Sequence, residues 1–227
     1  MSINHLELIV PSVAACALLT GGTGRIGSAV AARLEREGFR VLAAGRKHGD
    51  LSRPENARAL VETAVAELGG LDLVVYAAAG GFVPKRVEDV TEADWDTSVG
   101  SIAKGSFFVA QAAAAHLRRS ELALIVLIED VAAYQPWPSF APHCAAKAAQ
   151  AMLTRVLARA LAPEIRVCGV APGPVAVDPG QEDRRAAETL LGRIGTPEDI
   201  AEAVLYLTRA PFVTGTSLVV DGGRLLR

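Results

Sequence analysis

The feature that most constrains the fold of this chain is a glycine-rich turn, TGGTGRIG, at residues 20–27. It follows a short apolar run at 14–19, typical of a buried strand, and opens a segment at 26–38 whose apolar residues recur with helical spacing. Backbone can approach an anion closely only where side chains are missing, and the first amides of a helix lack intrahelical acceptors. Four glycines in eight residues exceed what a tight connection needs, so the turn predicts a phosphate-binding loop between a strand and a helix.

Strand-like and helix-like apolar patterns alternate through the rest of the chain. The segments that predict strands are 14–19, 39–44, 71–79, 122–128, 165–170 and 217–223. The segments that predict helices are 26–38, 57–68, 91–119, 142–162 and 196–209. Thr91 and Asp94 form a capping-box-like start for one helix, and Pro197 stands at the first position of another. This alternation predicts an α/β Rossmann fold, a doubly wound parallel β-sheet flanked by helices. No linker or repeat interrupts it, so we expect residues 1–227 to form one domain.

Composition supports this fold and excludes several kinds of partner. The chain is 51% hydrophobic but only 5% aromatic, so Ala, Val and Leu must build the core, as suits parallel strands buried on both faces. The formal net charge is -2 and the sequence has no run of Lys and Arg. Nothing in it therefore predicts binding to nucleic acid or to an anionic membrane.

The amino-terminal stretch and the cysteines bear on location and on metals. The apolar segment at 5–19 contains Glu7 and Pro11 and has no positively charged leader, so it predicts neither a membrane span nor a signal peptide. We expect a cytoplasmic protein. Cys16, Cys144 and Cys168 lack metal-ligand spacing, and we expect buried thiols at the first and last of them and no metal site.

The end of the second predicted strand bears on the choice of a dinucleotide. A cofactor with a free ribose 2′-hydroxyl usually meets an Asp or Glu there, but the sequence reads AAGRKHGD, with Arg46 and Lys47 and no acid at the strand end. Arg25 in the glycine turn adds another cation. These residues favour the 2′-phosphate of NADP(H) over NAD(H), unless Arg46 and Lys47 are simply solvated loop charges. Asp50 and Leu51 are then expected to lie against the adenine.

At this point the chain resembles the short-chain dehydrogenase/reductase family over essentially its whole length. The matching segments are TGGTGRIG, YAAAG (76–80), the His143-to-Lys147 spacing, APGPVAVD (171–178), GRIGTPEDIAEAVLYL (192–207) and TGTSLVVDGG (214–223). Arg25 and the IED…YQP segment resemble the pteridine-reductase branch, whose members use NADPH. The resemblance implies a nicotinamide cofactor, a small-molecule substrate, and a homo-oligomer, either a dimer or a homotetramer. The cofactor-binding residues it implies, with those above, are Thr20, Gly21, Thr23, Gly24, Arg25, Ile26, Gly27, Arg46, Lys47, Asp50, Leu51, Ala77, Ala78, Ala79, Lys147, Pro172, Gly173 and Val175.

The catalytic residues of the family carry over unevenly. Lys147 matches, but His143 stands at the position of the family's Tyr, Asp130 at that of its Ser and Ile102 at that of its Asn. Asp at the Ser position is common in the pteridine-reductase branch. The chain is also shorter than its relatives after the second strand, where GRKHGDLSRPEN (45–56) compresses a helix and a strand.

The residues themselves leave two functions open. His143 and Lys147 are four apart on one helix and can share a site. A cation keeps an imidazole neutral, whereas a carboxylate such as Asp130 stabilises its protonated form. One hypothesis is an NADPH-dependent oxidoreductase that passes hydride to a carbonyl or imine, with His143 and Asp130 as the proton donor. The other is a catalytically silent NADP(H)-binding or regulatory subunit.

Two side chains near these positions carry further expectations. Glu129 precedes Asp130 and is expected to be a surface or interface charge, because alternate residues of a strand point to opposite sides. Trp137, in YQPWPSF, is expected to pack in the structure or to form a wall of the substrate pocket, where it would suit a flat ring.

Overall fold

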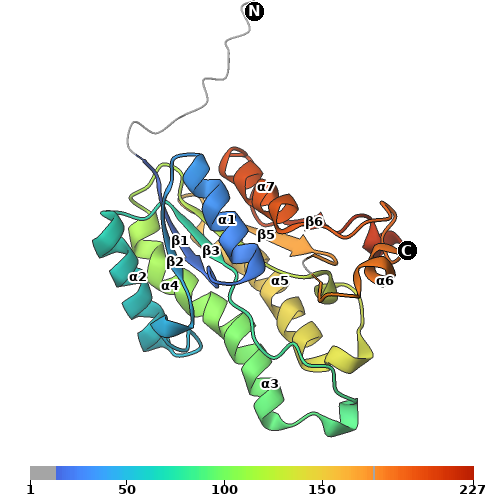
Figure 1. Ribbon diagram of the computed structural model, residues 1–227. Coiled ribbons are helices and arrows are strands. Elements are labelled where there is room, and N and C mark those ends of the chain that lie inside the picture. Colours follow the sequence, from blue (N-terminus) through green and yellow to red (C-terminus); the bar gives the residue numbers. More distant parts are fainter. Residues whose placement is uncertain (1–13, 176) are drawn as a thin grey trace, which may run out of the picture.

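A six-stranded parallel sheet forms the centre of the computed structural model, which describes residues 14–175 and 177–227 (Figure 1). Its strands are β1 (Cys16–Thr20), β2 (Arg40–Ala44), β3 (Leu73–Tyr76), β4 (Leu124–Ile128), β5 (Arg166–Pro172) and β6 (Ser217–Val220). Their order across the sheet is β2-β1-β3-β4-β5-β6, and every neighbouring pair is parallel. The predicted α/β fold is confirmed.

Helices cover both faces of the sheet. They are α1 (Arg25–Arg36), α2 (Pro54–Leu68), α3 (Glu92–Val99), α4 (Gly105–Leu117), α5 (Ala141–Leu161), α6 (Glu182–Ala186) and α7 (Pro197–Thr208). Residues of α1 and α7 pack on one face, and residues of α2, α4 and α5 pack on the other (Figure 1). Among the described residues, no helix is long and apolar enough to cross a membrane. The amino-terminal segment discussed above lies outside the described residues up to position 13.

The two faces share the strand residues alternately. In β1, Cys16 and Leu18 belong to the core under α2 and α4, whereas Ala17 and Leu19 belong to the core under α1 and α7. All five residues of β1 are buried. A central parallel strand is apolar throughout because both of its faces are covered, which explains the uninterrupted apolar runs in the sequence.

The predicted helix at 91–119 is continuous, but its middle is wound more widely than an α-helix. Its start is confirmed, since Thr91 and Asp94 form a reciprocal capping box. Between α3 and α4, however, the backbone adopts a π-helical segment, Gly100–Lys104. The Tyr76 hydroxyl donates to the Ser101 carbonyl there, and a Cβ at position 105 would overlap that hydroxyl. Gly105 thus lets the end of β3 approach this helix.

The connection from β2 to α2 is short, as the sequence predicts. It contains a single 3-10 turn, Arg46–His48, and no strand. As a result, among residues 14–175 and 177–227, β2 pairs only with β1 and forms one edge of the sheet. The turn is held by His48, whose Nδ1 accepts a hydrogen bond of 3.1 Å from the Gly45 amide.

Candidate active site

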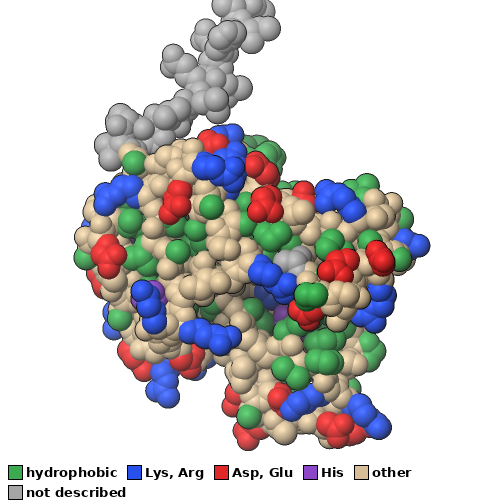
Figure 2. Space-filling view, in the orientation of Figure 1, with side chains coloured by type: hydrophobic (Ala, Val, Ile, Leu, Met, Phe, Trp, Pro, Cys, Tyr) green, Lys and Arg blue, Asp and Glu red, His purple; other side chains and the backbone are tan. Residues whose placement is uncertain are grey.

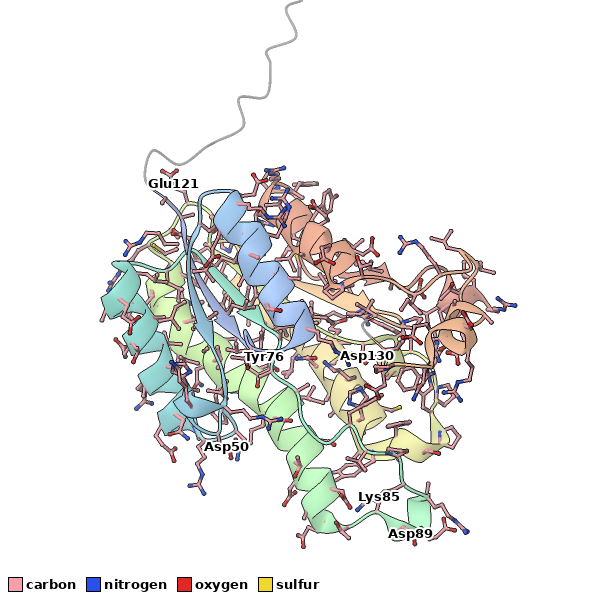
Figure 3. All side chains as sticks on the ribbon, viewed as in Figure 1. Asp50, Tyr76, Lys85, Asp89, Glu121 and Asp130 are labelled. Atoms are coloured by element: carbon pink, nitrogen blue, oxygen red, sulfur yellow. The ribbon has the colours of Figure 1, made fainter. Side chains whose placement is uncertain are left out.

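The predicted site residues meet at the edge of the sheet where the strands end. Because all six strands are parallel, their carboxyl ends lie at the same edge. Asp50, Tyr76 and Asp130 lie toward this edge, away from Glu121 (Figure 3). Figure 2 shows this part of the molecule hollowed near its centre, with Lys and Arg side chains along the rim.

The glycine turn is packed tightly onto the end of β3. Gly21 has φ +68°, and a Cβ there would lie 2.6 Å from the Ala77 carbonyl oxygen. The Thr20 hydroxyl oxygen accepts hydrogen bonds from the amides of Ala77 and Ala78, at 3.2 and 3.3 Å. A Cβ at Gly27 would overlap the Gly21 carbonyl. The predicted cofactor residues of the turn and of segment 77–79 are thus brought together.

The first backbone N–H groups of α1 can bind an anion. The first hydrogen bond of the helix runs from the Ser28 amide to the Gly24 carbonyl, at 2.8 Å. The amides of Arg25, Ile26 and Gly27 precede it and have no intrahelical acceptor. Gly24 offers no side-chain cap, and the first turn holds no acidic residue. This geometry fits the pyrophosphate of a dinucleotide, which would supply the missing acceptors and meet no carboxylate from the first turn of the helix.

The three predicted phosphate-selecting cations have different surroundings. The Arg25 guanidinium donates to the Val177 carbonyl at 3.0 Å and lies 3.6 Å from the Asp178 carboxylate. It therefore contacts the segment after β5. The side chains of Arg46 and Lys47 are exposed in the turn after β2, and within residues 14–175 and 177–227 they form no hydrogen bond or ion pair. They are available to a phosphate.

Asp50 keeps a fixed, ionised carboxylate beside the expected adenine position. The Ser52 amide and hydroxyl donate to its two oxygens, each at 2.9 Å. These hydrogen bonds hold the pKa of Asp50 below its ordinary value. Leu51 packs against the core on the α2 side of the sheet. The pair therefore combines one apolar side chain and one acceptor, as the predicted adenine contact requires.

Asp130 and His143 form a hydrogen-bonded pair. Asp130 follows β4, and one of its carboxylate oxygens accepts the Ala132 amide at 2.9 Å, which fixes the side chain. The other oxygen lies 3.2 Å from His143 Nε2, in the first turn of α5. The His143 side chain is 5% exposed and the Asp130 side chain 24% exposed. The carboxylate is therefore the member of the pair that solvent or a substrate reaches more readily.

The imidazole of His143 is enclosed by aromatic rings. Phe82 meets it edge-on with a centroid distance of 4.8 Å, and the Trp137 ring lies nearly parallel to it at 6.5 Å. Phe82 also stacks on Phe140 at 4.5 Å. His143 Nδ1 is buried and has no hydrogen-bond partner among the described residues. A bare acceptor is cheaper to bury than a bare N–H, so the pair is best satisfied with the proton on the Nε2 side, between the ring and Asp130.

Lys147 lies one turn further along α5 and is buried. Its Nζ donates to the Ile128 carbonyl at 2.7 Å and to the Gln150 side-chain oxygen at 3.0 Å. Burial lowers the pKa of Lys147 to about 8, against the opposing effect of the Asp130 and Glu129 carboxylates. The ammonium is thus fixed at the end of β4, close to the edge where the glycine turn lies.

The prediction that Glu129 is a surface or interface charge was wrong. Its side chain is 2% exposed; one oxygen accepts the Thr154 hydroxyl at 2.6 Å and the other accepts the Tyr134 hydroxyl at 3.2 Å. β4 lies between β3 and β5 with helices on both faces, so a side chain opposite to Asp130 points into the α5 layer. A Cβ at Gly169 would overlap this carboxylate. A glycine inside the apolar strand run at 165–170 was the available signal.

Backbone contacts hold the segment after β5 in place. Gly173 donates its amide to the Val220 carbonyl at 3.0 Å, and a Cβ there would lie 2.6 Å from the Asp221 Cα. Val175 forms a parallel bridge with Gly195. These contacts hold the predicted residues Pro172, Gly173 and Val175 at the same edge of the sheet, although Ala176 lies outside the described residues.

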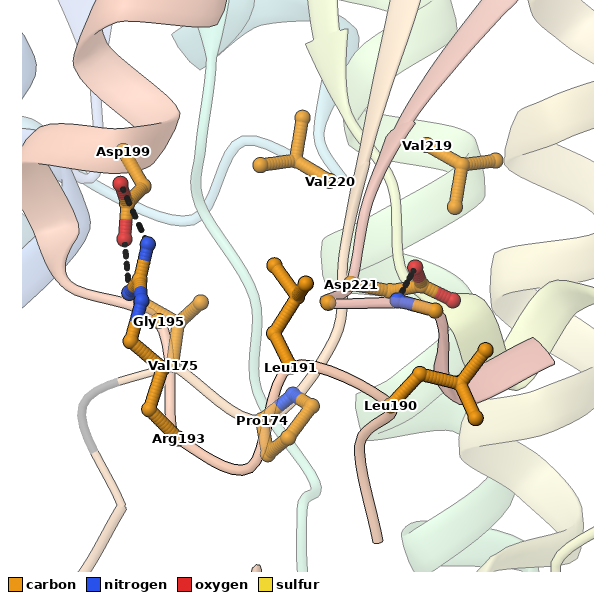
Figure 4. A pocket seen from close by; sticks show the side chains of 12 residues that line it. Pro174, Val175, Leu190, Leu191, Arg193, Gly195, Asp199, Val219, Val220 and Asp221 are labelled. Atoms are coloured by element: carbon orange, nitrogen blue, oxygen red, sulfur yellow. Dashed lines mark hydrogen bonds and ion pairs between the residues drawn. The ribbon is translucent and has the colours of Figure 1, made fainter. Parts of the chain in front are cut away.

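A pocket of about 390 Å³ lies next to this segment and was not predicted from the sequence (Figure 4). Pro174, Leu190 and Leu191 line it together with the end of β6, and the Arg193–Asp199 ion pair closes one side. None of the three predicted catalytic residues lines this pocket. The pocket therefore lies apart from the contact between Asp130 and His143.

Two other groups of residues near the pair were missed by sequence reasoning. Phe82 and Phe140 complete the aromatic surround, and Gln150 holds Lys147. Gln150 carried a signal, because it is polar at the third position after Lys147 on a helix face that is otherwise buried. Within the described residues no group of three or more His, Cys, Asp or Glu side chains could hold a metal ion.

Comparison with known sequences extends this picture. A model of the family described as enoyl-(acyl carrier protein) reductase matches residues 43–224. The chain is 33% identical over 241 residues to ketoacyl reductase 2 of the granaticin polyketide synthase of Streptomyces violaceoruber, covering 91% of this chain and 94% of that protein. It is 30% identical over 239 residues to dehydrogenase/reductase SDR family member 4 of Homo sapiens, covering 91% and 86%.

Solved structures agree. A 3-ketoacyl-(acyl-carrier-protein) reductase from Brucella melitensis, complexed with NADH, has a TM-score of 0.87 at 26% identity, covering 94% of this chain and 99% of that chain. A small-chain dehydrogenase in complex with NADPH has a TM-score of 0.84 at 28% identity, covering 94% and 100%. The fold described above is therefore shared with oxidoreductases that bind a nicotinamide cofactor.

Proposed function

Because this chain belongs to the short-chain dehydrogenase/reductase family of nicotinamide-dependent oxidoreductases, we propose that it uses NADPH to reduce a carbonyl or imine. The substrate is small and ring-shaped. The observation that carries the proposal is the 3.2 Å contact between Asp130 and His143, one helical turn from Lys147. These contacts support a role for the pair in holding a proton and for Lys147 in binding ribose, at the same edge of the sheet.

In the proposed reaction, different residues bind the cofactor and transfer the proton. A bound nicotinamide supplies the hydride that reduces the substrate carbon. The amides that open α1 bind the pyrophosphate, and Lys147 donates to ribose hydroxyls. The partly exposed Asp130 carboxylate takes up a proton from solvent, and the His143 N–H donates to it. That carboxyl proton passes to the substrate oxygen or nitrogen as negative charge develops there, and the carboxylate left behind takes up another proton from solvent, which restores the pair.

The preference for NADPH rests on the end of β2. Arg46 and Lys47 are exposed, close in sequence to the strand end, and no acid there competes for a ribose hydroxyl. Charge-assisted hydrogen bonds contribute about 1.5–3 kcal/mol each. Arg46→Ala with Lys47→Ala should therefore weaken NADPH binding at least about tenfold and leave NADH binding nearly unchanged. Equal losses for both nucleotides, measured by calorimetry, would contradict the assignment.

The ring-shaped substrate is supported by the aromatic surround. Trp137 and Phe140 come from the segment after β4, and Phe82 comes from the segment after β3. Their rings frame the imidazole that holds the proton. Flat rings gain from offset or edge-on contacts with such side chains. NADPH consumption with a panel of diketones, quinones and pterins tests this proposal, and turnover restricted to open-chain diketones would contradict it.

A catalytically silent cofactor-binding protein is the second candidate. Ile102, at the position of the family's Asn, is apolar and fully buried, and Ala77 and Ala78 replace a polar pair. A His143→Tyr exchange separates the two functions. Gain of NADPH-dependent reduction on exchange favours a silenced site, whereas loss of an existing activity favours the imidazole as the native acid.

We further propose a cytoplasmic homo-oligomer. Cys16, Cys144 and Cys168 are all unpaired thiols, which supports a reducing compartment. Met152 and Val156 are 54% and 51% exposed and lie four residues apart on α5. Apolar side chains spaced in this way form one stripe on a helix, which supports an interface with a second copy.

A further inference from the structure

One buried polar side chain beside Lys147 has no part in the mechanism above. Gln150 lies on α5, three residues after Lys147, and is fully buried. Its side-chain oxygen accepts a 3.0 Å hydrogen bond from Lys147 Nζ. Its Nε2 is buried and has no hydrogen-bond partner in the part of the chain that the structure describes. Lysine only donates, so this amide orientation follows from the contact.

Burying the Gln150 amide costs stability because its Nε2 has no partner among the described residues, so its retention points to the contact with Lys147. An unpaired buried donor destabilises a protein, and an apolar side chain of similar size would avoid that cost. The Lys147 ammonium has three N–H groups, of which one meets the Ile128 carbonyl and one meets Gln150. Two fixed acceptors leave one N–H with a defined direction. Gln150 thus restricts the orientation of the ammonium.

Gln150 is one of the two acceptors that Lys147 Nζ meets, and the hydrogen bond to Lys147 is the one that its side chain forms among the described residues. We propose that Gln150 is a positioning residue that fixes Lys147 for cofactor binding. The cofactor-binding part of this inference rests on the proposed function; the contact between Gln150 and Lys147 does not.

The charged form of Lys147 provides a direct readout. The groups that act on it are the Glu129 and Asp130 carboxylates at the end of β4, and His143 lies one turn away on the same helix. Burial lowers the pKa of Lys147 to about 8. The Gln150 oxygen stabilises the ammonium, so its removal should lower that pKa further, whereas a carboxylate in its place should raise it.

The test is a titration of the full-length protein labelled with ¹³C at the lysine ε position. The chain has only four lysines, Lys47, Lys85, Lys104 and Lys147, and the Lys147 signal is assigned by its loss in Lys147→Arg. Gln150→Met should lower its midpoint by about one pH unit, equivalent to about 1.4 kcal/mol. Ser106→Ala removes another buried side-chain hydrogen bond, from Ser106 to the Ala103 carbonyl, and should leave the midpoint in place.

Two further measurements complete the test. Gln150→Met should also weaken NADPH binding several-fold at pH 7, with Ser106→Ala as the matched control. If Gln150→Met does not fold, Gln150→Glu serves instead and should raise the Lys147 midpoint. A midpoint that stays at the wild-type value in the folded variant overturns the inference. Because the titration uses no substrate, its outcome is independent of whether the protein is a working reductase.

Discussion

At the scale of single residues, the candidate site depends on the contact between Asp130 and His143. Asp130 Oδ2 and His143 Nε2 are 3.2 Å apart, and only the carboxylate side is appreciably exposed. The Ala132 amide holds the other carboxylate oxygen, so the orientation is set by the backbone after β4. In the proposed reaction, the pair is therefore already held in the geometry from which a proton could be transferred.

Asp130→Asn is expected to abolish most of the reductase activity. The amide cannot accept a proton, and general acid catalysis by a positioned group contributes about 10²–10⁴-fold. We expect kcat/KM to fall in that range while the dissociation constant for NADPH stays within a factor of two. Steady-state kinetics and nucleotide titration measure the two quantities. Wild-type turnover in the variant would show that Asp130 takes no part in proton transfer.

Lys147 gives stability a distinctive pH dependence. Its pKa is about 8 in the folded protein against an ordinary value of 10.5, so between these pH values the unfolded chain binds more protons. The free energy of unfolding contributed by this group therefore rises with pH from about 8 to 10.5. Relative to Lys147→Met, the wild type should gain up to about 3 kcal/mol across that range. Urea unfolding at pH 7.5, 9 and 10.5 measures the difference, and parallel curves would refute it.

At the scale of elements, β4 and β5 are matched by a glycine facing a carboxylate. Glu129 directly follows β4, and Gly169 on β5 leaves room for its carboxylate. The Thr154 hydroxyl from α5 satisfies the carboxylate. The packing of β5 and α5 around the Glu129 carboxylate therefore depends on Gly169 having no Cβ.

Gly169→Ala should destabilise the protein by about 1–3 kcal/mol, as expected for an overpacked core. The same change should cost less in a Glu129→Ala background, because the overlapping carboxylate is gone. A double-mutant cycle by urea unfolding measures this coupling. Additive effects of the two substitutions would contradict the packing argument.

The sequence predicted the elements well because their signals are local. The glycine turn, the apolar runs and the Thr91–Asp94 capping box each depend on residues close together in the chain. The π-helical segment Gly100–Lys104 could not be predicted, because the Tyr76 hydroxyl that contacts it comes from β3. Glu129 was misplaced for the same kind of reason: the helices that bury it are far away in sequence.

At the scale of the whole molecule, the helices near the site also shape the outer surface. α5 carries His143 and Lys147 at its start and the exposed Met152 and Val156 further along. If the exposed stripe is the contact between copies, assembly and catalysis share one helix. Family resemblance predicted an oligomer, but the sequence alone did not indicate which of its apolar residues stay exposed.

Met152→Asp with Val156→Asp should reduce the oligomer to smaller species. Two carboxylates cannot be buried in an apolar contact without a large desolvation cost. Light scattering after size-exclusion chromatography measures the mass of the particle. An unchanged mass in the double variant would place the interface elsewhere.

The short connection after β2 has a consequence for aggregation. An outermost strand is a template on which foreign strands can grow. Here the strand is only five residues long, and the Arg40 guanidinium caps its beginning by binding the carbonyls of Leu68 and Glu67. The Arg40 amide and the Ala44 carbonyl face β1, so by alternation only Val41 and Ala43 present backbone groups outward. So short an outer strand offers another chain only two residues with outward backbone groups, which limits edge-to-edge pairing.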